Sequence, residues 1–158
     1  MRIAIGSDHA GYALKEEIKR YLEAAWDGQE PLDVEDVGCF SERSVDYPDY
    51  ALTVARKVAT GEVDRGILIC GTGIGMSIAA NKVKNVRAAL VHDLFSAEAT
   101  RKHNDSNILT MGGRIIGPDL AKAIVKTWLS TPFEGGRHAR RLDKIADMED
   151  DDSQFSRS

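Results

Sequence analysis

Short runs typical of β-strands alternate with longer amphipathic segments along most of the chain. The strand-like runs read RIAIG, LDVEDVG, GILIC, RAALVH and NILTMGG, and a segment with helical spacing of its apolar residues follows each of them. In the first such segment Leu14, Ile18 and Leu22 share one helix face. Lys15 and Lys19 fall on the opposite, polar face. The pattern predicts a strand-helix unit repeated five times, whose first helix packs on a sheet.

Strands that alternate with helices form parallel sheets covered on both faces, because each crossover places a helix on the sheet. We therefore predict an α/β fold: a single Rossmann-like three-layer αβα sandwich with a five-stranded parallel sheet. The pattern leaves the strand order open. The segment FEGGRHARRLDKIADMED predicts a sixth helix, a C-terminal helical arm that begins after two glycines.

Two segments stand apart from this rhythm. We expect one domain over residues 1–148, followed at 149–158 by EDDDSQFSRS, an acidic tail whose composition predicts disorder. The loop AAWDGQEPLDVED is longer and more acidic than a minimal connection. We interpret its residues 26–36 as a surface excursion without chemistry.

The composition narrows the class of protein. A chain of 158 residues with 42% apolar positions is long enough for one domain with a buried core. Its net charge of -4 argues against a nucleic-acid surface, which needs a basic face. No apolar run approaches the roughly 20 residues that span a bilayer, and no secretory leader or disulfide framework is apparent. We expect a cytoplasmic protein that binds neither membranes nor nucleic acids.

Polar residues follow the predicted strands, at the edge of the sheet where α/β folds bind ligands. The predicted strand ends are Ser7-Asp8-His9, Cys70-Gly71-Thr72, His92-Asp93 and Gly112-Gly113-Arg114. We also place His103 at this edge. A lone histidine is more often structural than catalytic, yet imidazole titrates near neutrality and can move a proton.

The loop CGTGIG joins a cysteine to three alternating glycines. Glycines at 71, 73 and 75 can turn successive N–H groups toward an anion or a developing oxyanion. The same loop favours a thiolate at Cys70. A dinucleotide fingerprint is a weaker interpretation, because Met76 replaces its third glycine. For Cys70, a catalytic thiolate and a buried, inert strand residue both remain open.

Arginines gather late in this acidic chain. Arg137 and Arg141 are four residues apart, so on a helix they share one side and can grip a phosphate together. Arg114 and Arg140 add to the local charge. A solvated helix face explains the same spacing, so both interpretations stand.

Five motifs in this order resemble one family. SDHAGYALKEEI, ERSVDYPDYA, GILICGTGIGMSIAANK, RKHNDSNILTMGGRIIG and EGGRHARR are similar to motifs of the ribose-5-phosphate isomerase B family, within the RpiB/LacA/LacB sugar-phosphate isomerases. The resemblance covers about residues 1–145. It implies interconversion of D-ribose 5-phosphate and D-ribulose 5-phosphate through a cis-enediolate, with no metal and no cofactor.

The resemblance also implies roles for individual residues. Cys70 matches the base of the family's cysteine branch, whereas Met76 or Ser77 occupies the glutamate branch's position. His103 matches the ring-opening residue, and Thr72 completes the catalytic set. The positions that match substrate-binding residues are Asp8, His9, Tyr47, Gly71, Gly73, Ile74, Gly75, Asn104, Arg114, Arg137 and Arg141, with His138 as a neighbour.

The family's active site lies at a dimer interface, and its C-terminal arginine helix reaches into the partner's site. The resemblance therefore implies a homodimer, which can pair into a tetramer. Two alternatives remain open: an isomerase of a six-carbon sugar phosphate, allose 6-phosphate or galactose 6-phosphate, and a sugar-phosphate sensor without catalysis.

Overall fold

The computed structural model describes residues 1–151 and confirms the predicted fold class. The strands are β1 (Arg2–Ser7), β2 (Asp33–Asp36), β3 (Arg65–Cys70), β4 (Ala88–Leu90) and β5 (Ile108–Gly112). The helices are α1 (Tyr12–Ala24), α2 (Tyr47–Ala59), α3 (Ile74–Ala80), α4 (Leu94–Asn104), α5 (Pro118–Ser130) and α6 (Arg137–Asp150). All strand pairs are parallel, in the order β2-β1-β3-β5-β4.

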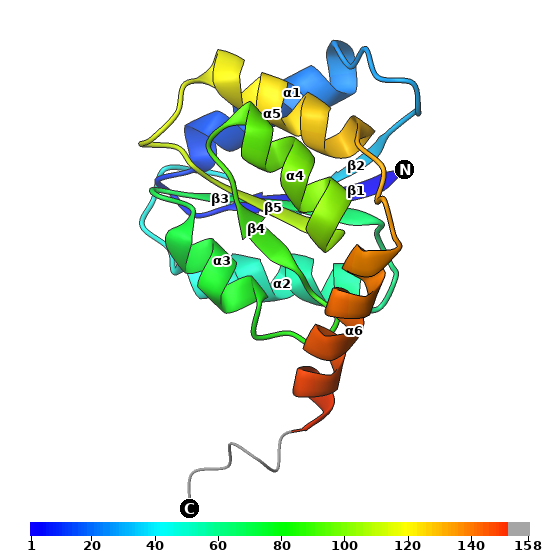
Figure 1. Cartoon of the computed structure of the whole chain (residues 1–158). Helices are drawn as coiled ribbons and strands as arrows, with labels where there is room; N and C mark the ends of the chain where they lie inside the picture. The colour runs from blue at the N-terminus through cyan, green and yellow to red at the C-terminus, as the bar shows by residue number, and fades with distance from the viewer. Residues whose placement is uncertain (152–158) are drawn as a thin grey trace, which may run out of the picture.

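Helices cover both faces of this sheet (Figure 1). On one face α1, α4 and α5 pack around Ile18, Ile124 and Trp128, all fully buried. On the other face α2 and α3 pack around Val54 and Met76, also fully buried. The central strands β1, β3 and β5 are therefore closed to water on both sides, which explains why they are continuous apolar runs in the sequence.

The strand order fixes where a ligand can bind. From β1 the chain crosses to β2 on one side and later to β3 on the other, so the crossovers diverge between β1 and β3. Connections that leave in opposite directions open a crevice at the carboxyl ends of these strands. Asp8 follows β1 and Cys70 ends β3, so both lie at this point.

Lys15 departs from the predicted pattern of α1. Helical spacing predicts it on the exposed face, but its side chain is 0% exposed. Its Nζ donates to both carboxylate oxygens of Asp36, over 2.7 and 2.8 Å, and lies 5.2 Å from the ring centre of Phe40. Burial alone would raise the pKa of Asp36, but hydrogen bonds from Lys15 and from the Gly38 N–H outweigh it and lower that pKa. The buried charge is thus paired.

Helix α6 forms the predicted arm and projects from the sandwich beside β4 (Figure 1). It continues to Asp150, so the first residues of the predicted tail are helical. Contacts between the end of α6 and the loop that precedes β4 explain this difference. Glu149 Oε2 accepts from the Asn85 N–H over 3.0 Å, and Lys84 pairs with Asp150. The predicted disorder of residues 152–158 lies outside the described residues.

Candidate active site

A cleft of about 440 Å³ opens at the carboxyl ends of β1 and β3. It brings together most of the residues that the sequence predicts for the site: Asp8, His9, Tyr47, Cys70, Gly71, Thr72, Ile74, Gly75 and Arg114. These residues come from segments far apart in the chain. Their common position follows from the parallel sheet, whose strand ends meet at one edge.

Cys70 is buried at the base of this cleft, with 4% of its surface exposed. Its Sγ accepts a hydrogen bond of 3.1 Å from the backbone N–H of Gly73. An N–H donor stabilises negative charge on sulfur, which suits a thiolate. Gly73 is also predicted to bind substrate, but it does not line the cleft, and its amide donates to the sulfur instead.

Two glycines of the loop are required for different reasons. Gly73 has a φ of 77°, and a Cβ there would lie 2.8 Å from the Met111 carbonyl carbon. Gly75 lies against the ring of Tyr47, where a Cβ would come within 2.6 Å of Cζ. Gly73 therefore sets the turn that presents Cys70, and Gly75 lets an aromatic wall close over the loop.

Some backbone N–H groups of the glycine loop donate hydrogen bonds to acceptors within the loop itself. Besides the Gly73 N–H on sulfur, the Ile74 N–H donates to Thr72 Oγ1 over 3.3 Å. The sequence predicts that all the N–H groups of this loop can bind an oxyanion. The structure leaves fewer of them available, because these two N–H groups already have acceptors. The amides of Gly71, Thr72 and Gly75 are the remaining candidates.

Asp8 and His9 form the opposite wall. Asp8 is 6% exposed, and its Oδ1 accepts from the N–H groups of Ala10 and Gly11, each over 3.0 Å. His9 Nδ1 accepts from the Val45 N–H over 3.2 Å. In the neutral ring this hydrogen bond leaves Nε2 as the protonated nitrogen, so His9 can donate a hydrogen bond into the cleft.

His92 has a structural role rather than a catalytic one. Its Nε2 accepts from the Gly112 N–H over 2.9 Å, which ties the end of β5 to the loop after β4. Burial lowers the pKa of His92 against a smaller opposing effect of Asp93. The neutral ring that accepts this hydrogen bond is therefore favoured.

His103 does not lie at the carboxyl edge, and this prediction is wrong for the single chain. Helix α4 runs back along the sheet, so its last residues reach the amino ends of β4 and β5. There Arg87, which precedes β4, donates from Nε to the carbonyl of Asn104 over 3.1 Å. Arg137 and Arg141 are both exposed and lie in the first turns of α6, which begins nearby. The structure thus separates His103, Asn104, Arg137 and Arg141 from the cleft of the same chain.

These distant residues form a cluster of their own. The rings of His103 and His138 stack with centres 4.4 Å apart. Glu134 Oε2 lies 3.6 Å from His138 Nε2, and the Glu134 N–H donates to the Lys102 carbonyl over 3.2 Å. Burial, followed by the charges of His103 and Arg137, lowers the pKa of His138. Sequence spacing does not single out Glu134, because it lies in a loop.

The sequence does not predict two of the residues that line the cleft, Ala10 and Ile78. Ile78 is 60% exposed and follows Ile74 by four residues, so both lie on one face of α3. That spacing of two apolar residues directly after the glycine loop is the signal that could have found it.

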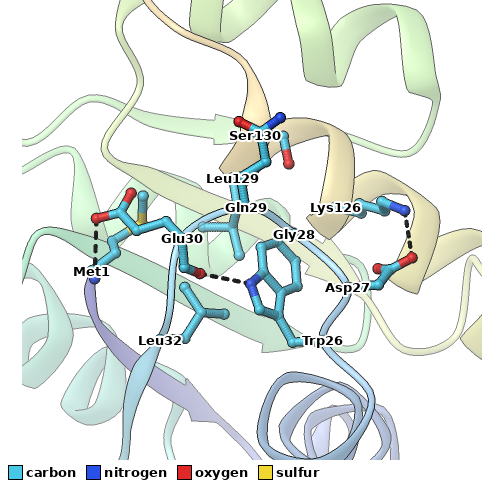
Figure 2. Close-up of a pocket in the computed structure, with 10 residues that line it drawn as sticks. All are labelled: Met1, Trp26, Asp27, Gly28, Gln29, Glu30, Leu32, Lys126, Leu129 and Ser130. Carbon is cyan, nitrogen blue, oxygen red and sulfur yellow. Dashed lines mark hydrogen bonds and ion pairs between the residues drawn. The ribbon is translucent and has the colours of Figure 1, made fainter.

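A second cavity, of about 410 Å³, lies under the loop between α1 and β2 (Figure 2). Several of its polar groups already have partners: Trp26 Nε1 donates to the Glu30 carbonyl over 2.8 Å, and Lys126 Nζ lies 2.6 Å from Asp27 Oδ2. Its lining holds no histidine or cysteine. The acidic loop thus closes the amino end of the sheet against α5, and the chemistry belongs to the other cleft.

No helix within residues 1–151 combines the length and apolar character of a membrane span. Residues 3–145 match the family model described as Ribose/Galactose Isomerase. YwlF of Bacillus subtilis, provisionally named a sugar phosphate isomerase, is 58% identical over 95% of this chain and 98% of its own length. Ribose-5-phosphate isomerase B of Escherichia coli is 48% identical over 94% and 96%.

A further relative carries a different substrate in its name. D-erythrulose-4-phosphate isomerase of Pectobacterium atrosepticum is 46% identical over 92% of this chain and 93% of its own. Among solved structures, ribose-5-phosphate isomerase B of Clostridium thermocellum superposes with a TM-score of 0.91 at 51% identity, covering 99% of this chain and 100% of that chain. The sensor alternative finds no support in these relatives. The chain belongs to the ribose/galactose isomerase family, in its type B branch, and is an isomerase of sugar phosphates.

Proposed function

We propose that this enzyme interconverts D-ribose 5-phosphate and D-ribulose 5-phosphate, with Cys70 as the general base. The observation that carries the proposal is the Gly73 N–H on Cys70 Sγ, at the base of a cleft walled by Asp8 and His9. A sulfur held in this way can exist as a thiolate and face a sugar carbon. The relatives named ribose-5-phosphate isomerase B support the choice of substrate.

The reaction moves one proton between two neighbouring carbons. The Cys70 thiolate takes the proton from C2 of the open-chain aldose, and the electron pair of that C–H bond forms the C1–C2 double bond of an enediolate. The loop amides stabilise the oxygen that becomes negative. The C2 hydroxyl gives up its proton and O1 gains one, and the thiol then returns the first proton to C1, which leaves a hydroxyl on C1 and the ketone oxygen on C2. No redox partner is needed, because the aldehyde carbon is reduced as the alcohol carbon is oxidised.

The residues outside the cleft act, in this proposal, from a second copy of the chain. His103 of one subunit opens the sugar ring in its partner's cleft, and Asn104 holds an enediolate oxygen. Arg137 and Arg141 join the cleft's own Arg114 at the phosphate. Within one chain these groups are separated from the cleft, so a single subunit would lack a ring-opening residue.

Exposed apolar side chains support such an interface. Ile74, Ile78, Leu94 and Phe95 are 51%, 60%, 46% and 81% exposed, and they belong to α3 and to the start of α4, beside the cleft. Large apolar groups gathered at one edge of a soluble protein mark a contact surface. A homodimer that buries them would also bring α4 of each subunit to the other's cleft.

The test is the conversion of ribose 5-phosphate with a chelator present, for the wild type, Cys70→Ala and Cys39→Ala. Cys39 is the matched control, since it is also buried, at 3% exposed, but lies outside the cleft. We expect turnover in the wild type and in Cys39→Ala only, with sugar-phosphate affinity kept in Cys70→Ala. Full activity of Cys70→Ala would refute the base. A wild type that acts only on erythrulose 4-phosphate or on six-carbon phosphates would refute the substrate.

A further inference from the structure

The cluster of His103, Glu134 and His138 has the composition of a metal-binding site. Each residue offers one ligand atom, and these atoms all lie within 4.8 Å of one another. Two imidazoles and one carboxylate form a donor set that zinc and its neighbours in the first transition row accept. Magnesium and calcium prefer oxygen donors, which argues for a borderline transition metal.

The second observation concerns His138 alone. Its side chain is 8% exposed, and its Nε2 is buried without a hydrogen-bond partner among the described residues. A buried polar atom without a partner costs free energy, so such atoms in native proteins usually have a ligand, an ion or water to satisfy them. This nitrogen lies 3.6 Å from Glu134 Oε2, beyond a hydrogen bond but close to the spacing of two ligands on one ion.

To share one ion with His138, the His103 ring has to turn out of its stack on His138, because an imidazole nitrogen binds a metal in the plane of its ring. Two nitrogens bound to one tetrahedral zinc are about 3.4 Å apart, given bonds of about 2.0 to 2.1 Å. His138 is fixed by burial, whereas His103 and Glu134 are exposed and can turn toward it. The Glu134 backbone is anchored on Lys102, one residue before His103, so the two mobile ligands stay within reach.

We propose that His103, Glu134 and His138 bind one zinc-like divalent cation, and that this ion inhibits the enzyme. Three protein ligands leave a fourth position open, which differs from the closed, four-ligand pattern of structural zinc sites. The inhibitory part rests on the proposed function: an ion held by His103 occupies the imidazole that would open the sugar ring. The binding part depends on this chain's residues alone.

Cobalt(II) titration tests the binding part, because its visible bands report the ligand set. We compare the wild type with Glu134→Gln and, as the matched control, Glu98→Gln, an exposed carboxylate that pairs with Lys102 beside the same cluster. We expect one cobalt per chain without a sulfur-to-metal charge-transfer band. Glu134→Gln should weaken binding by more than the roughly 10- to 100-fold cost of losing an outer-shell partner. Glu98→Gln should bind as the wild type does.

Three results would overturn the site: no cobalt bands at a large excess of metal, a charge-transfer band that assigns the ion to Cys70 or Cys39, or equal affinity in Glu134→Gln. Inhibition is measured separately with zinc. We expect zinc to lower the kcat of the wild type, because it occupies the ring-opening imidazole, and to have little effect on Glu134→Gln, whose metal-free activity is unchanged. Bound zinc without inhibition would refute the inhibitory role. A chelated wild type inactive on ribose 5-phosphate would refute the proposed function, while the cobalt result would still decide the site.

Discussion

The backbone N–H of Gly73 donates a 3.1 Å hydrogen bond to the sulfur of Cys70. The two residues are three apart, and only the left-handed turn at Gly73, with φ of 77°, aims the amide back at the end of β3. The hydrogen bond on the sulfur therefore depends on a backbone conformation that L-residues rarely adopt. A change in Gly73 should act on chemistry and on stability together.

Gly73→Ala tests this dependence, with Gly61→Ala as the matched control. Gly61 also has a positive φ, of 76°, but a Cβ there meets nothing within 4 Å. Gly61→Ala should cost about 1 to 2 kcal/mol of stability and leave kcat unchanged. Gly73→Ala should cost more, because its Cβ meets Leu90 and Met111, and should lower kcat by on the order of 100-fold. Denaturant unfolding and steady-state kinetics measure both; equal kcat in the two variants would contradict the role of the amide.

Lys15→Met should destabilise the fold although it places an apolar side chain in a buried position. It removes the main partner of Asp36, whose side chain is 8% exposed, and leaves that carboxylate with the Lys19 ammonium at 3.3 Å and the Gly38 N–H at 2.9 Å. We expect a loss of about 3 kcal/mol at pH 7 in urea unfolding. An unchanged midpoint would show that the pair contributes no net stability.

The same pair predicts an acid dependence. Because the folded pKa of Asp36 is lowered, the unfolded chain binds more protons between the two pKa values. The stabilisation is present above the unfolded value, about 4, and is lost as pH falls through the folded pKa. As the pH falls from about 5 to about 3, Lys15→Met should therefore lose less stability than the wild type does. Parallel stability curves over this range would contradict it.

His92 predicts a dependence nearer neutrality. Its folded pKa is lowered, so the hydrogen bond from the Gly112 N–H to the neutral ring is fully present above the unfolded value of about 6.5. It is lost as pH falls from there through the folded pKa. Urea unfolding from about pH 7.5 to about pH 5 should show a smaller loss in His92→Gln than in the wild type. His138, also lowered, remains in both proteins, so the difference isolates His92.

The sequence predicts the cleft better than it predicts the distant cluster. Cys70 and Asp8 could be placed because each ends an apolar run, and parallel strand ends meet at one edge. His103 could not, because it ends a helix, and a crossover helix returns to the opposite edge. Lys15 was misplaced for another reason: helical spacing treats lysine as polar, whereas its partner Asp36 lies 21 residues away on a neighbouring element.

Phe95→Glu should separate the proposed subunits. Phe95 is 81% exposed on α4, so a charge there is harmless in a monomer but costly at an apolar interface. We expect half the wild-type mass by light scattering and no turnover. Leu52→Glu, at an exposed apolar position on α2, is the control and should keep both. An active Phe95→Glu monomer would remove the need for a partner.

A mixing experiment tests directly whether His103 acts across the interface. Cys70→Ala and His103→Ala should each be inactive alone, because the proposed homodimer of either variant lacks one group in both sites. When the two are unfolded and refolded together at equal concentration, half of the dimers are mixed, and each mixed dimer has one site with an intact Cys70 facing an intact His103. Activity should therefore return to roughly one quarter of the wild type.

Double-variant subunits provide the control for this recovery. Refolding wild type with a chain that carries both substitutions also gives mixed dimers, but each of their two sites then lacks one group, so only the quarter of dimers that are fully wild type contribute. If each site combines Cys70 of one subunit with His103 of the other, activity should appear in the first mixture and should fall to roughly one quarter of the wild type in the second. If both groups act within one chain, the first mixture stays inactive and the second keeps about half the activity, because every wild-type subunit then works whatever its partner.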